Sequence, residues 1–173
     1  QTATTSGQAS GELTGMKIAY VEIDTLLAQY NFCIDLNEGM VKKSENVRLT
    51  LNQKARELDK QKQDFQTKYQ NNAYLSPERA QQEYNRIAKL EQDLQTLSNK
   101  LQSELMSENE KNSLQLRDSI NAFLKEYNKT KGYSMIISNT GFDNLLYADS
   151  IYNITKEIVE GLNARYSSPA PKK

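Results

Sequence analysis

The chain has 173 residues, of which 37% are apolar, and its mean hydropathy is −0.77. Its 22 basic and 22 acidic residues cancel, so no bulk electrostatic attraction to nucleic acid or an anionic membrane is expected. Because it has no histidine and one cysteine, Cys33, the sequence holds no zinc constellation and no catalytic triad. We therefore expect neither an enzyme nor a metal or cofactor, and we interpret Cys33 as a small buried apolar residue.

The amino-terminal part predicts a leader, a strand and a short helix. Residues 1–15 are rich in Thr, Ser, Gly and Gln, which predicts a flexible leader. Such an opening indicates that a targeting segment has been removed, and one hypothesis places a lipid-bearing cysteine just upstream. Residues 16–23 are rich in β-branched and aromatic types and predict a largely buried strand. Asp24 is expected to cap a short helix containing Leu26 and Leu27.

The most informative feature is the absence of glycine between Gly39 and Gly132, a run in which Pro77 is the only proline. Because glycine and proline interrupt regular structure, this run predicts two very long helices that form a hairpin. The tip is expected at residues 71–77. There Ser76 suits the N-cap, Pro77 suits the first helical position, and the preceding asparagines tolerate a left-handed helix end.

Apolar residues recur at coiled-coil spacing in both predicted helices, but the first helix is the less complete. Its alternate seam positions are polar, beginning with Lys54, so that seam is half occupied. The second helix has a better heptad, a stutter at Leu105, and then Asn109 and Asn112 in the seam. This pattern predicts an arm that is flexible about midway. The predicted seam residues are Leu51, Leu58, Ile87, Leu90, Leu94, Leu97 and Leu101.

After the helical run the periodicity changes from helical to strand-like. Residues 133–138 predict a strand, residues 139–144 a turn, and residues 145–148 a second strand. Asn153 is then expected to cap a closing amphipathic helix, and residues 167–173 to form a disordered tail. The apolar face of the closing helix consists of Ile154, Ile158, Val159 and Leu162.

These elements predict an α+β fold that is mostly α, with a long antiparallel helical hairpin projecting from a small β-rich head. The head combines residues 16–38 and 132–166, and the arm covers residues 39–131. A head of about 60 residues is marginal by itself and leaves strand edges unpaired. We therefore expect oligomerisation through the head. The predicted head residues are Ile18, Tyr20, Val21, Ile23, Met135, Ile136, Ile137, Leu145, Leu146 and Tyr147.

The chain resembles the Skp (OmpH) family of periplasmic chaperones over about residues 16–166. The resemblance rests on KIAYV at 17–21 with DTLL at 24–27, and on YSMII at 133–137. It rests also on LLYA at 145–148 and DSIYNIT at 149–155. Each motif is weak alone, whereas the combination at these spacings is fairly specific.

The resemblance implies a homotrimer in which three heads form a small barrel-like body and three hairpins surround a central cavity. It implies a periplasmic holdase, membrane-tethered if a lipid anchor precedes the leader, that binds unfolded outer-membrane proteins without ATP. The lack of a phosphate-binding glycine loop agrees with that activity. The best-studied type of the family is strongly basic, whereas this chain is neutral, so attraction to anionic clients or lipopolysaccharide is not assumed for it.

Apolar and aromatic side chains around the tip are the predicted client contacts. The alternative is that the same residues only staple the hairpin turn. These residues are Phe65, Tyr69, Tyr74, Leu75 and Tyr84.

Three other functions remain as alternatives to a holdase of this family. A structural coiled-coil scaffold or spacer of the cell envelope would handle no clients, and the half-filled first seam favours a chaperone over it. A prefoldin-like chaperone is disfavoured because the predicted strands lie outside the hairpin. A nucleic-acid binder would require a basic surface, and no nucleic-acid partner is expected.

Overall fold

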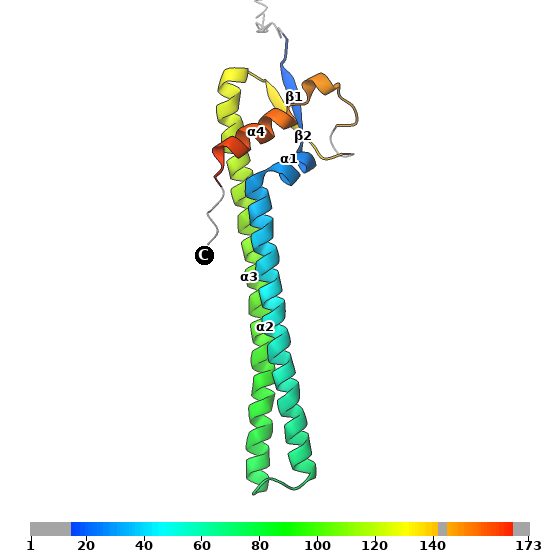
Figure 1. Cartoon of the computed structure of the whole chain (residues 1–173), viewed down its shortest axis with the longest axis vertical. Coiled ribbons are helices and arrows are strands. Elements are labelled where there is room, and N and C mark those ends of the chain that lie inside the picture. Colours follow the sequence, from blue (N-terminus) through cyan, green and yellow to red (C-terminus); the bar gives the residue numbers. More distant parts are fainter. Residues whose placement is uncertain (1–14, 142–144, 168–173) are drawn as a thin grey trace, which may run out of the picture. The chain divides into compact units, whose positions relative to one another are not determined.

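The computed structural model describes residues 15–141 and 145–167, and it is mostly helical with a small β part, as predicted (Figure 1). The predicted leader, except Gly15, lies outside the described residues. So do the tail after Ser167 and part of the turn at 139–144. The elements are β1 (Ile18–Glu22), α1 (Ile23–Gln29), α2 (Asn31–Gln70), α3 (Pro77–Lys131), β2 (Met135–Asn139), the 3-10 helix η1 (Ser150–Tyr152) and α4 (Thr155–Arg165).

The chain divides into two compact units. One contains the residues up to Cys33 and from Asp118 onward, and it holds both strands, α1, η1 and α4. The other, Ile34–Arg117, consists of the paired parts of α2 and α3 with the turn between them.

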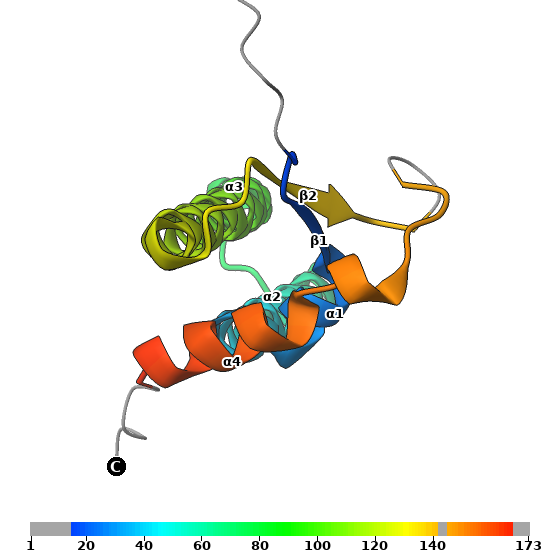
Figure 2. The same ribbon diagram turned by 90° about the horizontal axis from the view of Figure 1, so that it is seen from above.

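The two strands pair in parallel, with Ile18 opposite Met135 and Glu22 opposite Asn139. The other edge of β1 is also occupied, because the carbonyl of Tyr20 accepts a hydrogen bond from Ile154 N–H at 3.0 Å. β1 therefore lies between β2 and the start of α4 (Figure 2). Within the described residues, β2 pairs with β1 alone.

The closing helix packs its apolar face into the core of this unit. The four apolar residues predicted for its buried face, from Ile154 to Leu162, are all buried. Asn153 Oδ1 accepts from Thr155 N–H at 3.0 Å and so satisfies the first helical N–H, although the N-cap position is Ile154, which makes no side-chain cap bond. The hydroxyl of Thr155 accepts in turn from Glu22 N–H at 2.8 Å, so the end of β1 is joined to the start of α4.

The start of the first long helix differs from the prediction. Asp24 lies inside the first turn of α1 and does not cap it, because β1 continues into the helix through Glu22 and Ile23 without a capping side chain. Tyr30 is extended and separates α1 from α2, and its buried hydroxyl lies 2.9 Å from that of Ser119. Cys33 is buried, as predicted.

Burial along the long helices refines the predicted seams. α2 begins eight residues before Gly39, so that glycine lies inside a helix and not at its start. In the first seam Ala55 is half-buried where Lys54 was expected. In the second, Glu108 is half-buried and Asn109 is exposed, because the stutter shifts the inward face by one position.

The strand predicted at residues 145–148 does not form. Leu146 and Tyr147 are 86% and 85% exposed, and the backbone there is irregular. Strand-forming composition needs a neighbouring strand to supply hydrogen-bond partners, and the described part of this chain offers none at that segment.

Two helical glycines should respond oppositely to alanine. A Cβ on Gly39 meets no atom within 4 Å, so Gly39→Ala should stabilise the fold by about 1 kcal/mol through helix propensity. A Cβ on Gly161 would overlap Cζ of Phe123 and stand 2.9 Å from Cε2, so Gly161→Ala should destabilise it by about 1–3 kcal/mol. Thermal and urea unfolding, followed by circular dichroism, measure both changes. Shifts of the same sign would contradict the packing described here.

Candidate functional site

The turn between the long helices ends α2 with a Schellman motif. Asn72 is the one non-glycine residue with a positive φ in the described chain, at 52°, as the predicted asparagine stop requires. Its N–H donates to the Tyr69 carbonyl at 3.2 Å, and Ala73 N–H donates to the Lys68 carbonyl at 2.9 Å. These bonds satisfy carbonyls at the helix end and fix where the chain reverses.

The restart of helix at Pro77 also follows the prediction. Ser76 Oγ accepts from Arg79 N–H at 3.2 Å, which is the predicted N-cap bond. The pKa of Glu78 is lowered, first by its own backbone N–H and then by the Ser76 hydroxyl. A negative charge is therefore favoured at the positive end of α3.

An aromatic cluster surrounds Phe65 beside this turn. The Phe65 ring stacks on Tyr69 one helical turn later, with centroids 5.9 Å apart. Tyr74 from the turn lies 5.7 Å away, and Tyr84 from α3 lies 6.2 Å away. The structure thus brings four of the five predicted tip residues together. Leu75 is 95% exposed, while Tyr69 and Tyr84 are 62% and 57% exposed.

Polar side chains near the cluster bond to one another and affect Tyr74 electrostatically. Arg86 Nη2 donates to Gln61 Oε1 on the opposite helix and to Glu83 Oε1, each at 2.6 Å. The Arg86 hydrogen bond lowers the pKa of Glu83, and Lys68 contributes a smaller effect. Burial, followed by the charge of Glu83, raises the pKa of Tyr74.

The predicted head residues fall into three groups by burial. Tyr20 and Val21 are buried in the core of their unit. Met135, Leu146 and Tyr147 are exposed. The remaining five are half-buried: Ile18, Ile23, Ile136, Ile137 and Leu145.

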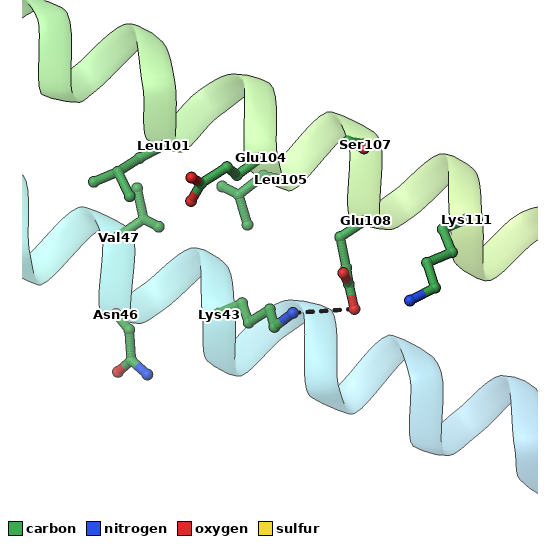
Figure 3. Close-up of a pocket in the computed structure, with 9 residues that line it drawn as sticks. All are labelled: Lys43, Asn46, Val47, Leu101, Glu104, Leu105, Ser107, Glu108 and Lys111. Carbon is green, nitrogen blue, oxygen red and sulfur yellow. Dashed lines mark ion pairs between the residues drawn. The ribbon is translucent and has the colours of Figure 1, made fainter.

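The predicted seam residues lie between the two helices, where Leu58 and Ile87 are buried and the other five are half-buried. An open groove of about 490 Å³ lies between the two helices next to Leu101. Figure 3 shows Val47 and Leu105 on its facing walls. Lys43 Nζ reaches across the groove to Glu108 Oε1 at 3.0 Å, which lowers the pKa of Glu108. The Lys43–Glu108 ion pair therefore takes the place of the apolar contacts that a complete coiled-coil seam would have here.

Sequence reasoning missed two residues near these sites. Ala80, near the start of α3, is buried, and its position seven residues before Ile87 in the same heptad could have identified it. Ile151 is 75% exposed close to Leu146 and Tyr147 in sequence, but no periodic signal marks a residue of a 3-10 helix.

Two kinds of site are absent from the described residues. These residues contain no group of three or more His, Cys, Asp or Glu side chains placed to hold a metal ion. No helix among them combines the length and apolarity needed to cross a bilayer.

The lowered pKa values of Glu78 and Glu83 make the turn sensitive to acid. Because the folded pKa lies below the unfolded value, the stabilisation is complete above about pH 4.5 and is lost as the pH falls through the folded pKa. Glu78→Gln with Glu83→Gln should therefore destabilise the protein at pH 7, and the difference from the unmodified protein should shrink below about pH 4.5. Urea unfolding at both pH values measures this. A difference that grows on acidification would refute the assigned direction.

The comparisons with known proteins show the family and a similar fold. The comparison with curated proteins gave no match. The solved structure of an OmpH-like protein from Caulobacter crescentus CB15 is similar, with a TM-score of 0.78 at 12% identity. The match covers 95% of this chain and 94% of that one, and it supports the same fold. The family model for OmpH-like outer membrane proteins matches residues 17–162, which include every helix and strand except the last turn of α4. The chain therefore belongs to the OmpH-like family.

Proposed function

We propose that this protein is an ATP-independent holdase that binds unfolded outer-membrane proteins in the periplasm. In this proposal three copies associate through the strand-bearing unit, and clients occupy a cavity between three helical hairpins. The observation that carries the proposal is the family match over residues 17–162, which spans both the strand pair and the complete helical hairpin. The similar Caulobacter crescentus protein is described as a candidate outer membrane chaperone, which supports the same function.

Exposed apolar groups on the strand-bearing unit support self-association. β2 leaves one edge without a partner among the described residues, and unpaired edges promote association. Met135 on that strand is exposed, and Leu146 and Tyr147, seven and eight residues after the end of the strand, are exposed as well. Large apolar side chains gathered in one segment indicate a protein interface more often than isolated ones do. We assign this surface to contacts between copies of the chain.

The hairpin turn supports client binding. Phe65 and Tyr74 are half-buried within the aromatic cluster and hold the turn, while Tyr69, Leu75 and Tyr84 present exposed surface. A coiled-coil spacer has no use for a leucine that is 95% exposed at its tip. A holdase needs such groups, because it must contact an extended chain weakly and at several places. We therefore assign the client contacts to the turn and keep the staple role for its two half-buried rings.

Self-association can be tested by charge substitution on the exposed segment. The purified protein should have the native mass of three chains by analytical ultracentrifugation. Leu146→Asp with Tyr147→Asp should lower the native mass, because each carboxylate would be buried in the interface. Val41→Asp with Met106→Asp, at two exposed positions of the helical hairpin, is the matched control and should leave the mass unchanged. A native mass of one chain at micromolar concentration would refute the trimer.

Client holding can be tested by dilution of a urea-denatured β-barrel outer-membrane protein into nucleotide-free buffer. Light scattering should fall as the protein is added and should reach its minimum near one trimer per client. The charge variant at Leu146 and Tyr147 should suppress scattering less, because it would no longer form the cavity. If a molar excess of the unmodified protein leaves the scattering unchanged, the protein is not a holdase, and the spacer function becomes the better description.

A further inference from the structure

The aromatic cluster beside the turn consists of one central ring and three surrounding tyrosines, two of which are exposed. Phe65 is the central ring, and three tyrosine centroids lie 5.7 to 6.2 Å from it. Two of these tyrosines, Tyr69 and Tyr84, are more than half exposed, and Leu75 in the turn is 95% exposed. Packing within the chain accounts for Phe65 and Tyr74, but it leaves most of the surface of the other three side chains in water.

The charges around the turn are balanced. Residues 64–86 contain three basic and three acidic side chains. Two of them, Arg86 and Glu83, neutralise each other in a two-bond ion pair with distances of 2.6 and 3.0 Å. A turn without net charge gives no long-range attraction to phosphate groups, which disfavours nucleic acid and anionic lipid as the occupant. The balanced charge therefore favours a neutral partner.

An extended chain can present several side chains to the turn. Side chains two residues apart on a strand lie on the same face, roughly 6.8 Å from each other. In the cluster, the half-buried Phe65 ring lies 5.7–6.2 Å from each of three tyrosine rings, and two of these, Tyr69 and Tyr84, are exposed. Strands of outer-membrane barrels carry aromatic residues at both ends, on the face that alternates with polar positions. Such a segment could set successive rings against neighbouring rings of the turn.

The exposed tyrosine rings should also prefer an aromatic partner over an aliphatic one. Aromatic pairs favour offset or edge-to-face contacts that stabilise beyond the area they bury. Tyrosine also loses little conformational freedom on contact, because it has only two side-chain torsions. An aromatic side chain should therefore bind here more tightly than an aliphatic one of similar hydropathy.

We infer that Tyr69, Leu75 and Tyr84 form a site for the aromatic side chains of a neutral, extended client segment. Phe65 is a positioning residue, because its ring contacts both of these tyrosine rings. The inference rests on the proposed holdase function and names the client feature that the turn recognises. It assigns recognition to ring contacts and not to charge.

The test measures fluorescence anisotropy of two labelled peptides with the full-length protein. One peptide alternates Phe or Tyr with Ser and Thr, and the other carries Leu at every aromatic position. The aromatic peptide should bind at least about five-fold more tightly, as expected for two ring contacts. Tyr69→Gln with Leu75→Gln and Tyr84→Gln should reduce its affinity to that of the leucine peptide.

The matched control removes three exposed apolar side chains elsewhere on the same hairpin. Leu49→Gln with Met106→Gln and Leu114→Gln should leave both affinities unchanged. Because two tyrosines contact Phe65, helicity and the unfolding midpoint of the turn variant are measured as well. The single variant Leu75→Gln, at a position without packing, should retain full stability and still weaken the aromatic peptide.

Each outcome decides the inference. Equal affinity for the two peptides, or a turn variant that binds the aromatic peptide like the unmodified protein, overturns it. Binding to anionic phospholipid vesicles that the turn variant loses would assign the site to lipid and also overturn it. If the unmodified protein fails to keep a denatured client soluble, the proposed function fails instead. If it succeeds and the turn variant shows no loss of the aromatic preference, only this inference fails.

Discussion

The parallel pairing of β1 with β2 is the constraint on which the rest of the structure depends. The two strands are separated by both long helices, so the chain must return to the place it left before the ladder can form. Parallel strands need such a crossover connection, and here the crossover is an entire helical hairpin. The reversal is concentrated in one Schellman turn, where Asn72 takes the left-handed conformation. A helix that ran straight through that point would carry β2 away from its partner.

The features that the sequence predicts well are those with local causes. Ser76 and Pro77 restart a helix because one supplies an N-cap oxygen and the other lacks an N–H that would be unsatisfied. The buried face of α4 follows from helical spacing alone. The prediction of a strand at 145–148 was wrong. Amino-acid composition indicates a preference for strand, but it does not show whether a neighbouring strand is there to supply hydrogen-bond partners. Whether Glu108 or Asn109 faces inward depends on where the stutter takes effect, which only the pairing of both helices decides.

The sequence predicts which residues belong to the candidate site, but it does not show which of them pack within the chain and which are exposed. Five side chains near the turn share an apolar or aromatic character, and nothing in their order separates those that pack from those that are exposed. The separation arises because Phe65 faces the opposite helix while Leu75 lies in the reversal itself, where neither helix can cover it. Exposure of this kind is a property of the completed turn. It therefore cannot be read from helical spacing.

A holdase without an energy source must release its clients, and the strength of its contacts limits how it can do so. A single aromatic contact contributes roughly 0.5–1.5 kcal/mol beyond burial, so a few rings bind a segment only weakly. Several weak contacts at high effective concentration retain a client, although each contact breaks readily. A strongly charged turn would add attraction that falls with ionic strength, whereas the balanced charges at residues 64–86 remove that dependence. Under the function proposed for this chain, ring contacts at a turn without net charge would therefore make retention depend on the number of aromatic residues that the client exposes. A client that buries those residues as it folds would lose its contacts one at a time and leave without ATP.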